Sequence, residues 1–333
     1  TSLATTIAAG LASHYADTVT LTANPSAASN FVPNGGGAAQ GTVSGGSVKV
    51  TSGSGTASAL QYSEVGSFTL KAVPSTSYLN SGVDLANRAV VFADNASLTS
   101  WVGRFVPHHF TAVGAVSNAC VGGVFTYMGQ PFALSSSDKK VVEARNAQDV
   151  LTQNYATTFG YAPGIVGFAA ENADDGVNLS SCLSIGSGSW VAGAYTLSSG
   201  NGSFSRATTP DGAFDSLDIG VSVADADVPA LPKVYGADMD PAAVGGTSFA
   251  YKKLTGSPLK MRYGRVRLLN ANGSNLLDLS MAMRAEYWQS PAVGWQVHAA
   301  DQCSEATLSF TPIASFDASK TCVWDTGSAS GNS

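Results

Sequence analysis

Short stretches in which apolar and polar residues alternate constrain the fold of this chain more than any other sequence feature. Residues 18–23 read Thr-Val-Thr-Leu-Thr-Ala, and residues 47–51 and 67–72 alternate in the same way. A period of two with many β-branched side chains is typical of a strand with one buried face. Turn residues separate such stretches at intervals of roughly ten residues. The pattern predicts an all-β chain of tandem immunoglobulin-like or β-sandwich domains with long Gly/Ser-rich loops.

We expect four parts along the 333 residues. Residues 1–14 are a linker or a short helix, and residues 15–100 are an immunoglobulin-like β-sandwich. Residues 101–245 form a second β-rich domain, in which the spaced aspartates and prolines of 214–246 predict a linker or an irregular crossover. Residues 246–333 form a further sandwich with a polar tail, and its expected strands are 259–269, 276–279, 282–288 and 294–298.

The charge balance bears on the class of partner. Only 12% of the residues are charged, and 17 Lys and Arg stand against 23 Asp and Glu. Nucleic-acid binding needs clustered Lys and Arg, so we expect no nucleic-acid partner. No apolar run reaches about 18 residues, so we expect no transmembrane segment. The chain begins with Thr rather than Met, which suggests a processed chain or a piece of a longer precursor.

The four cysteines bear on the compartment. None belongs to a C-x-x-C pair, and an even number suits disulfides in an oxidising compartment. This favours the periplasm, the cell surface or the extracellular space. The disulfide candidates are Cys120, Cys182, Cys303 and Cys322. Three connectivities are open, and we favour Cys120–Cys182 with Cys303–Cys322 because each pair shares a local segment; four free buried thiols are the alternative.

Motifs for catalysis are missing from the sequence. There is no Gly-x-Ser-x-Gly elbow and no phosphate loop ending in Gly-Lys-Ser/Thr. A glycosidase needs two carboxylates that flank a sugar, but no spacing singles out a pair among Glu171, Asp215 and Asp218. We therefore expect no enzyme and no catalytic residue.

Metal binding rests on acidic residues in loops. Alternate carboxylates in a loop can supply some of the oxygens that calcium needs. The calcium candidates are Asp174, Asp175, Asp225, Asp227, Asp238 and Asp240. His108 and His109 would point to opposite faces of a strand, so we expect a structural role for them. No cofactor is expected apart from this calcium.

Tryptophan and arginine side chains are the candidates for ligand binding. Trp190 and Trp324 stand beside small or acidic residues and are our candidates for an exposed sugar-stacking surface, whereas Trp288 and Trp295 are expected in a core. Arg265 and Arg267 would share one strand face, which suits either an acidic partner or a cross-strand partner such as Glu286.

Seven stretches occur in one order over roughly residues 100–305. They are GRFVPHHF (103–110), FTYMGQPF (125–132), TQNY (152–155), RYGR (262–265), LDL (277–279), EYW (286–288), and GW (294–295) followed by DQC (301–303). Together they resemble the uncharacterised C-terminal region of the MSHA pilus biogenesis protein MshQ and related bacterial surface proteins. That family usually has an acidic residue where His108 stands and proline-containing sequence at 280–283. It also continues past its last cysteine, so the resemblance implies either that the last domain lacks strands or that the missing part was cleaved or left out.

The resemblance implies a non-enzymatic, cell-surface or pilus-associated structural or adhesion protein of a Gram-negative bacterium. It would act through protein–protein or strand-edge contacts with pilus or envelope proteins, because an incomplete sandwich exposes an edge that another strand can complete. The alternative is a carbohydrate-binding adhesin that holds surface glycans with exposed aromatic side chains.

Overall fold

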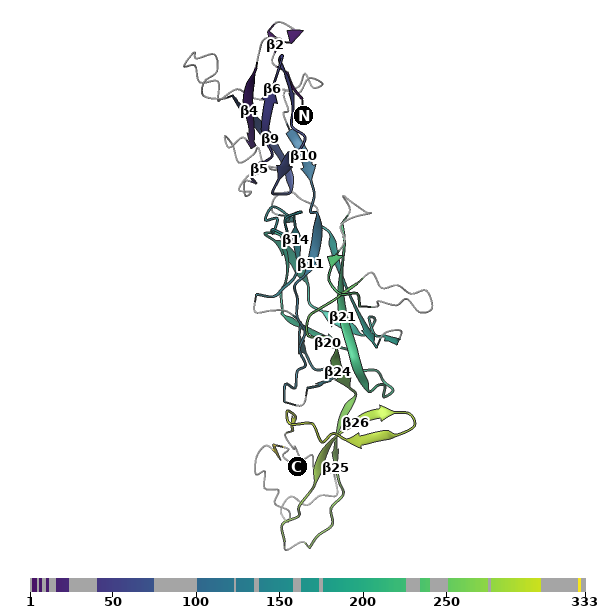
Figure 1. Ribbon diagram of the computed structural model, residues 1–333. Coiled ribbons are helices and arrows are strands. Elements are labelled where there is room, and N and C mark those ends of the chain that lie inside the picture. The colour runs from purple at the N-terminus through teal and green to yellow at the C-terminus, as the bar shows by residue number, and fades with distance from the viewer. Residues whose placement is uncertain are drawn as a thin grey trace.

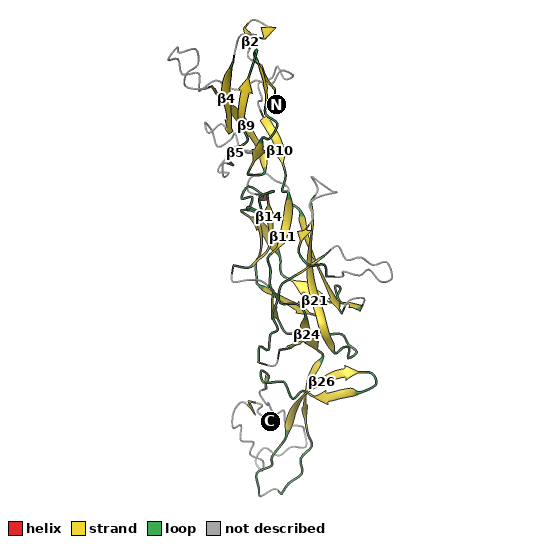
Figure 2. Ribbon diagram, viewed as in Figure 1, coloured by secondary structure: helices red, strands yellow, loops and turns green. Residues whose placement is uncertain are grey.

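All regular structure in the described part of the chain is β. The computed structural model describes residues 2–4, 6–7, 10–11, 16–23, 41–74, 101–122, 124–134, 138–157, 163–173, 176–225, 234–239, 251–274, 277–306 and 329–330. Strands are the only regular elements among these residues (Figure 2). Within the same residues, no helix is long and apolar enough to cross a membrane. The all-β prediction is confirmed, and the immunoglobulin-like type stays a prediction.

Three groups of strands follow one another along an elongated molecule (Figure 1). We call the described residues up to Phe105 the N-terminal module, those from 109 to 262 the central module, and those from 264 onward the C-terminal module. One hydrophobic cluster lies among strands of the N-terminal module; the other is centred on the central module and also includes Val65, with Trp288 and Trp295 packed against it.

The N-terminal module is built around a four-stranded antiparallel sheet in the order β10-β9-β4-β6, with β1–β7, β2–β3 and β5–β8 as smaller pairs. Its strands are β1 (Ser2–Ala4), β2 (Thr6–Ile7), β3 (Gly10–Leu11), β4 (Asp17–Ala23), β5 (Val43–Ser44), β6 (Ser47–Val50), β7 (Ser54–Thr56), β8 (Gln61–Tyr62), β9 (Gly66–Pro74) and β10 (Trp101–Phe105). Val19, Leu21 and Ala23 of β4 are buried, as the alternation predicts. Three short strands lie within residues 1–14, where we expected a linker or a short helix.

The central module holds two larger sheets, in the orders β18-β19-β14-β11-β22 and β12-β24-β21-β15-β16, with β23 paired to β21 and a third sheet β13-β20-β17. Its strands are β11 (His109–Ala112), β12 (Thr126–Tyr127), β13 (Phe132–Ala133), β14 (Lys140–Arg145), β15 (Ile165–Asn172), β16 (Val177–Asn178), β17 (Leu183–Ile185), β18 (Gly188–Val191), β19 (Ala194–Leu197), β20 (Asn201–Phe204), β21 (Phe214–Ala224), β22 (Val234–Tyr235), β23 (Lys252–Lys253) and β24 (Leu259–Arg262).

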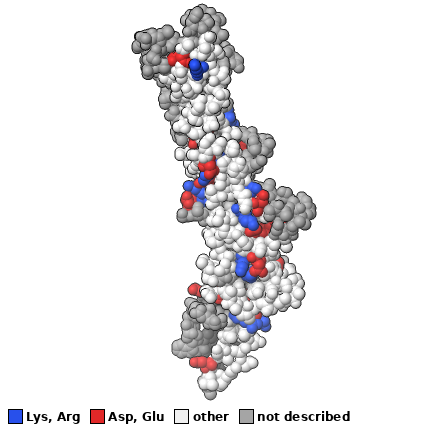
Figure 3. Space-filling model, viewed as in Figure 1, with Lys and Arg blue, Asp and Glu red and all other residues white. Residues whose placement is uncertain are grey.

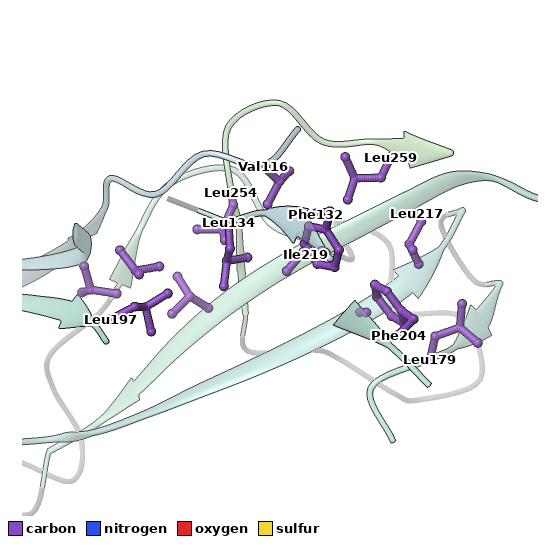
Figure 4. Close-up of a cluster of buried hydrophobic side chains, with 14 of the residues drawn as sticks. Val116, Phe132, Leu134, Leu179, Leu197, Phe204, Leu217, Ile219, Leu254 and Leu259 are labelled. Carbon is purple, nitrogen blue, oxygen red and sulfur yellow. The ribbon is translucent and has the colours of Figure 1, made fainter. Parts of the chain in front are cut away.

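The core of the central module lies between these sheets. Figure 4 shows Phe132 and Phe204 beside Leu217 and Ile219, which β21 contributes. Leu217, Ile219 and Val221 have no exposed surface. β21 therefore occupies the middle of its sheet, between β15 and β24.

The C-terminal module contains a three-stranded antiparallel sheet, β25-β26-β27, and the pair β28–β29. The strands are β25 (Gly264–Leu268), β26 (Met283–Ser290), β27 (Gly294–Val297), β28 (Glu305–Ala306) and β29 (Ala329–Ser330). β26 and β27 confirm the strands expected at 282–288 and 294–298.

Three element predictions were wrong. Residues 214–224, expected in a linker or crossover, form the longest described strand, β21. Its apolar residues Leu217, Ile219 and Val221 alternate with Asp218 and Gly220, and the spaced aspartates led us to expect a loop instead. The single strand expected at 259–269 is divided at Tyr263 into β24 and β25, which belong to different sheets. Residues 277–279 are described and form no strand.

Candidate functional site

The contacts between modules form two junctions, and the first depends on a buried carboxyl group. Glu64 follows β8 and is buried; its Oε1 accepts a hydrogen bond from the backbone N–H of Gln153 at 2.8 Å, and its Oε2 accepts one from Asn154 at 3.1 Å. Burial raises the pKa of Glu64, although these backbone N–H groups oppose the change. The next residue, Val65, packs into the core of the central module. Glu64 and Val65 thus fasten the N-terminal module to the central one.

Asn146 completes this junction. Its Nδ2 donates to the carbonyl of Ser63 at 2.9 Å, and its Oδ1 accepts from the backbone N–H groups of Gln148 and Val150. A short polar side chain that bonds its own following backbone is typical of a tight turn. The same residue therefore shapes the turn after β14 and contacts the neighbouring module.

The second junction joins β12 of the central module to the segment after β27. The hydroxyl of Tyr127 donates to Oδ2 of Asp301 at 2.8 Å and lies 2.6 Å from Nδ1 of His298. Because the hydroxyl proton goes to Asp301, a neutral His298 carries its own proton on Nδ1 and donates it to Tyr127. A Cβ on Gly264 would lie 2.4 Å from the Tyr127 ring, so glycine at the start of β25 makes room for this contact.

The three polar groups of this junction have shifted pKa values. Burial, followed by the hydrogen bond to Asp301, raises the pKa of Tyr127. Burial lowers the pKa of His298, against the opposing effect of the Asp301 charge. Burial alone would raise the pKa of Asp301, but hydrogen bonds from Ser304, Cys303 and Tyr127 lower it. The folded junction therefore favours a neutral tyrosine, a neutral histidine and an ionised aspartate.

A disulfide crosses the same junction. Cys120 of the central module is bonded to Cys303 of the C-terminal module, 183 residues later. This bond takes one cysteine from each of the two pairs that we favoured, so both predicted pairs are wrong. We had favoured cysteines close in sequence, and sequence proximity does not reveal that the segment after β27 lies against Cys120. Cys182 is half-buried and forms no disulfide, and Cys322 lies outside the described residues. A loop of this length contributes about 5 kcal/mol by the chain-entropy estimate.

Arginines surround one buried glutamate on β25 and β26. Glu286 has a side chain that is only 2% exposed and pairs with Arg265 at 2.6 Å and with Arg284 at 2.7 Å; Arg267 lies 3.7 Å away. Burial alone would raise the pKa of Glu286, but Arg265 and Arg284 lower it. Glu286 stands directly opposite Arg265 in the register, which is the cross-strand alternative that we named for the two predicted arginines. Three cations around one anion leave a local charge of +2.

Aromatic rings extend this arginine cluster toward the central module. The guanidinium of Arg265 lies 3.9 Å from the centre of the Trp295 ring, and Trp295 meets Trp288 edge-on at 5.7 Å. Both tryptophans are partly buried against the central core, which agrees with the core role that we expected. On the face shown in Figure 3, basic and acidic side chains lie side by side in small groups with uncharged surface between them.

Trp190 is not a surface residue, contrary to our prediction. It is 5% exposed, packs against Phe110 and Tyr155, and donates from Nε1 to the carbonyl of Gly164 at 2.8 Å. The small neighbours that suggested exposure instead mark an alternating strand, in which Trp190 points inward and its neighbours point out. Trp324, the other candidate, lies outside the described residues.

His108 and His109 do not point apart as predicted. Their Nδ1 atoms are 3.1 Å from each other, and Nε2 of His109 lies 3.1 Å from Asp149 Oδ1. The alternation argument fails because β11 begins only at His109, so His108 is not part of a strand. The His109 ring also stacks on Tyr235 at 4.4 Å.

The two acidic candidates that the structure describes have different partners. Tyr155 donates to Asp225, and Lys252 pairs with Asp238. The other calcium candidates, Asp174, Asp175, Asp227 and Asp240, lie outside the described residues. Where the structure describes the chain, no three His, Cys, Asp or Glu side chains gather around a point that could hold a metal. The calcium site stays a prediction.

The three carboxylates weighed for catalysis separate into two places. Asp215 pairs with Arg262 beside the second junction. Glu171 and Asp218 stand directly opposite each other on β15 and β21, and both are buried. These two residues are 47 positions apart in the sequence, and no local pattern predicts that they face each other across paired strands.

No sequence pattern predicted a role for Glu64, Tyr127, His298 or Asp301. Tyr127 and Asp301 do lie in the stretches that carry the family resemblance, as do Gln153 and Asn154 at the first junction. The family resemblance was therefore the sequence feature that could have pointed to the junctions, because several of its stretches lie where modules meet.

Comparisons with known proteins identify two family models. The model of the DUF6701 third domain matches residues 64–250, and that of the DUF6701 fourth domain matches residues 262–332. The first match begins at Glu64 and the second begins at Arg262, next to the two junctions. No curated protein and no solved structure matches the chain.

Proposed function

The chain belongs to the DUF6701 family, and from this premise we propose that it is a non-enzymatic structural or adhesive component of a bacterial cell surface or pilus. The disulfide between Cys120 and Cys303 supports a location in an oxidising compartment, outside the cytoplasm. The resemblance to MshQ-like proteins supports the envelope of a Gram-negative bacterium as that place.

The observation that carries the proposal is the bracing of both junctions. Modules joined by small polar interfaces move relative to one another by default. Here the second junction has a covalent bond together with the Tyr127, His298 and Asp301 contacts, and the first has buried Glu64 and Val65. Such bracing suits a protein that has to keep its modules in line while it holds other molecules.

Contacts with a partner protein would use the C-terminal module. Its arginine cluster carries a local charge of +2, and Arg267 is half-exposed, so an acidic surface is a suitable partner. Among the described residues, β25 and β27 are the edges of their sheet, and another strand could extend it there. The carbohydrate-binding alternative has less support, since Trp190 is buried and contributes no stacking surface.

The experiment that tests the proposal is mass spectrometry of surface fibres sheared from the source cells, with and without their major pilin. A pilus component is expected in the fibre fraction and disappears with the pilin. Recovery in the cell or medium fraction regardless of the pilin would contradict the pilus role. Tryptophan fluorescence titrations with glycans would then test the carbohydrate-binding alternative.

A further inference from the structure

A lysine and two carboxyl groups meet on the outer face of β15 and β21. Leu217 and Ile219 of β21 point into the core, so Asp218 between them points to the opposite face. Glu171 stands directly opposite Asp218 in the antiparallel register. Nζ of Lys253, from the neighbouring strand β23, lies 2.6 Å from Oδ2 of Asp218. Three strands thus bring an amine and two carboxyl groups together.

The two carboxyl groups of this cluster are largely closed to water, whereas the Lys253 side chain is 31% exposed. Glu171 is 4% exposed and Asp218 is 9% exposed. Two residues further along β21, a Cβ on Gly220 would lie 2.8 Å from Met239 Sδ and 2.9 Å from Tyr251 Cβ, so these side chains cover the strand closely. Oδ1 of Asp218 is buried and has no hydrogen-bond partner. A carboxylate held in this way loses solvation that its single ion pair restores only in part.

The facing positions of Glu171 and Asp218 bear on the reactivity of the cluster. Two ionised carboxylates directly opposed on paired strands repel each other. A proton passed from the ammonium of Lys253 to Asp218 would remove this repulsion and leave the one negative charge on Glu171. The transfer leaves a neutral amine against a carboxylic acid, which is the pair of groups that condenses to an amide.

We propose that Lys253 and Asp218 form an intramolecular isopeptide bond, with Glu171 as the proton relay. Nζ of the neutral lysine attacks Cγ of the protonated Asp218 carboxyl group, and the new C–N bond forms. Glu171 takes a proton from the nitrogen and delivers it to the departing hydroxyl. The C–O bond breaks and one water molecule leaves. The products are an amide and water, and no group is oxidised or reduced.

The neighbouring pair provides a comparison within the same strand. Lys252 pairs with Asp238, but the side chain of that aspartate is 49% exposed, against 12% for Asp218. Solvent stabilises the ion pair in this more open setting. The chemistry therefore selects Lys253 and leaves Lys252 as an ordinary ion pair.

The bond would add a covalent connection between β21 and β23. The segment between Asp218 and Lys253 would become a closed loop, and β23 could no longer separate from the middle strand of its sheet. The inference depends only on the chemistry of this cluster, so it stands apart from the surface role proposed above.

Intact mass spectrometry of the full, reduced and denatured chain tests the proposal. We expect a mass lower than the sequence value by one water molecule, and a branched proteolytic peptide that joins the segments around Asp218 and Lys253. Lys253→Arg should restore the full sequence-derived mass, whereas the matched control Lys252→Arg should keep the loss of water. A wild-type chain at its full mass, or a branch at another residue, would overturn the proposal.

A second variant tests the proton relay. Glu171→Gln keeps both bond-forming residues and the shape of the side chain but cannot carry the proton. We expect the folded variant to remain at full mass. A cross-linked Glu171→Gln protein would refute the role of Glu171, and circular dichroism of each variant shows whether it has folded.

Discussion

Buried polar side chains mark the places where the modules of this protein meet. At the first junction, the Glu64 carboxyl group accepts hydrogen bonds from two backbone N–H groups of the central module. At the second, Tyr127 receives a hydrogen bond from His298 and gives one to Asp301. A buried polar group that loses its partner costs about 1–3 kcal/mol, so each contact favours one arrangement of the modules over others. Single residues thus determine how separate sheets fit together.

The buried His298 predicts a loss of stability in mild acid. Its pKa is lowered in the folded protein, mainly by burial, so the unfolded chain binds a proton more readily below its ordinary pKa of about 6.5. The free energy of unfolding should therefore fall as the pH drops from about 7 to about 5, by less than about 1.4 kcal/mol per unit for one proton. Urea denaturation at several pH values measures this slope.

The matched variant for this prediction is His298→Gln, which does not titrate but still forms hydrogen bonds. Glu64 acts in the opposite direction, because its raised pKa means that stability falls as the pH rises through the range just above 4.5. The difference between wild type and variant isolates His298 from that effect. An equal slope in both proteins would show that another group is responsible.

At the scale of elements, the pairing of β25 with β26 depends on one anion among three cations. Glu286 accepts from Arg265 and Arg284 and lies near Arg267. Glu286 itself is only 2% exposed, whereas the three arginines are 35–51% exposed, so water would solvate the arginines only in part if the carboxylate were removed. The arginines would then repel one another across adjacent strands. The strand pair is therefore sensitive to Glu286 and much less sensitive to the outermost arginine.

Replacing Glu286 by Gln should destabilise the C-terminal module by about 1–3 kcal/mol, the cost of leaving hydrogen-bonding groups without their charged partner, because the arginines are partly exposed to solvent. Arg267→Gln is the control, because its side chain is 51% exposed and its contact is long. It should cost less than about 1 kcal/mol. Chemical denaturation of both variants measures the difference. Equal losses for the two substitutions would mean that the cluster adds little to the strand pairing.

The sequence predicted elements well where a strand has one covered face. β4 alternates in burial as it alternates in sequence, and β26 and β27 lie where their patterns placed them. β21 was missed although its apolar residues alternate, because its aspartates are typical of loops; in the structure Asp218 pairs with Lys253 and Asp215 pairs with Arg262. The opposed Glu171 and Asp218 were unpredictable for a related reason, since register between distant strands leaves no local signal.

At the scale of the whole molecule, the candidate site depends on contacts that connect modules. The second junction joins Tyr127 to Asp301 and Cys120 to Cys303, and the residues of each pair lie more than 170 positions apart in the sequence. The cysteines could be named as candidates from the sequence, but the pairs that they and Tyr127 form could not, because each pair depends on how one module stacks on another. The modules follow one another along an elongated molecule (Figure 1), so the contacts that cross from one module to the next bear directly on its shape.

Removal of the disulfide between Cys120 and Cys303 should loosen the second junction while leaving each sheet folded. The double variant Cys120→Ser with Cys303→Ser keeps the Tyr127 contacts but loses the only described covalent link between the central and C-terminal modules other than the chain itself. We expect the free energy of unfolding to fall by about 2–5 kcal/mol. Small-angle X-ray scattering should show a broader distribution of distances, because the C-terminal module can then reorient. Cys182→Ser is the control, since this half-buried cysteine forms no disulfide, and it should leave the scattering unchanged. A double variant with the scattering curve of the wild type would mean that the hydrogen bonds of Tyr127 hold the modules in line without the disulfide.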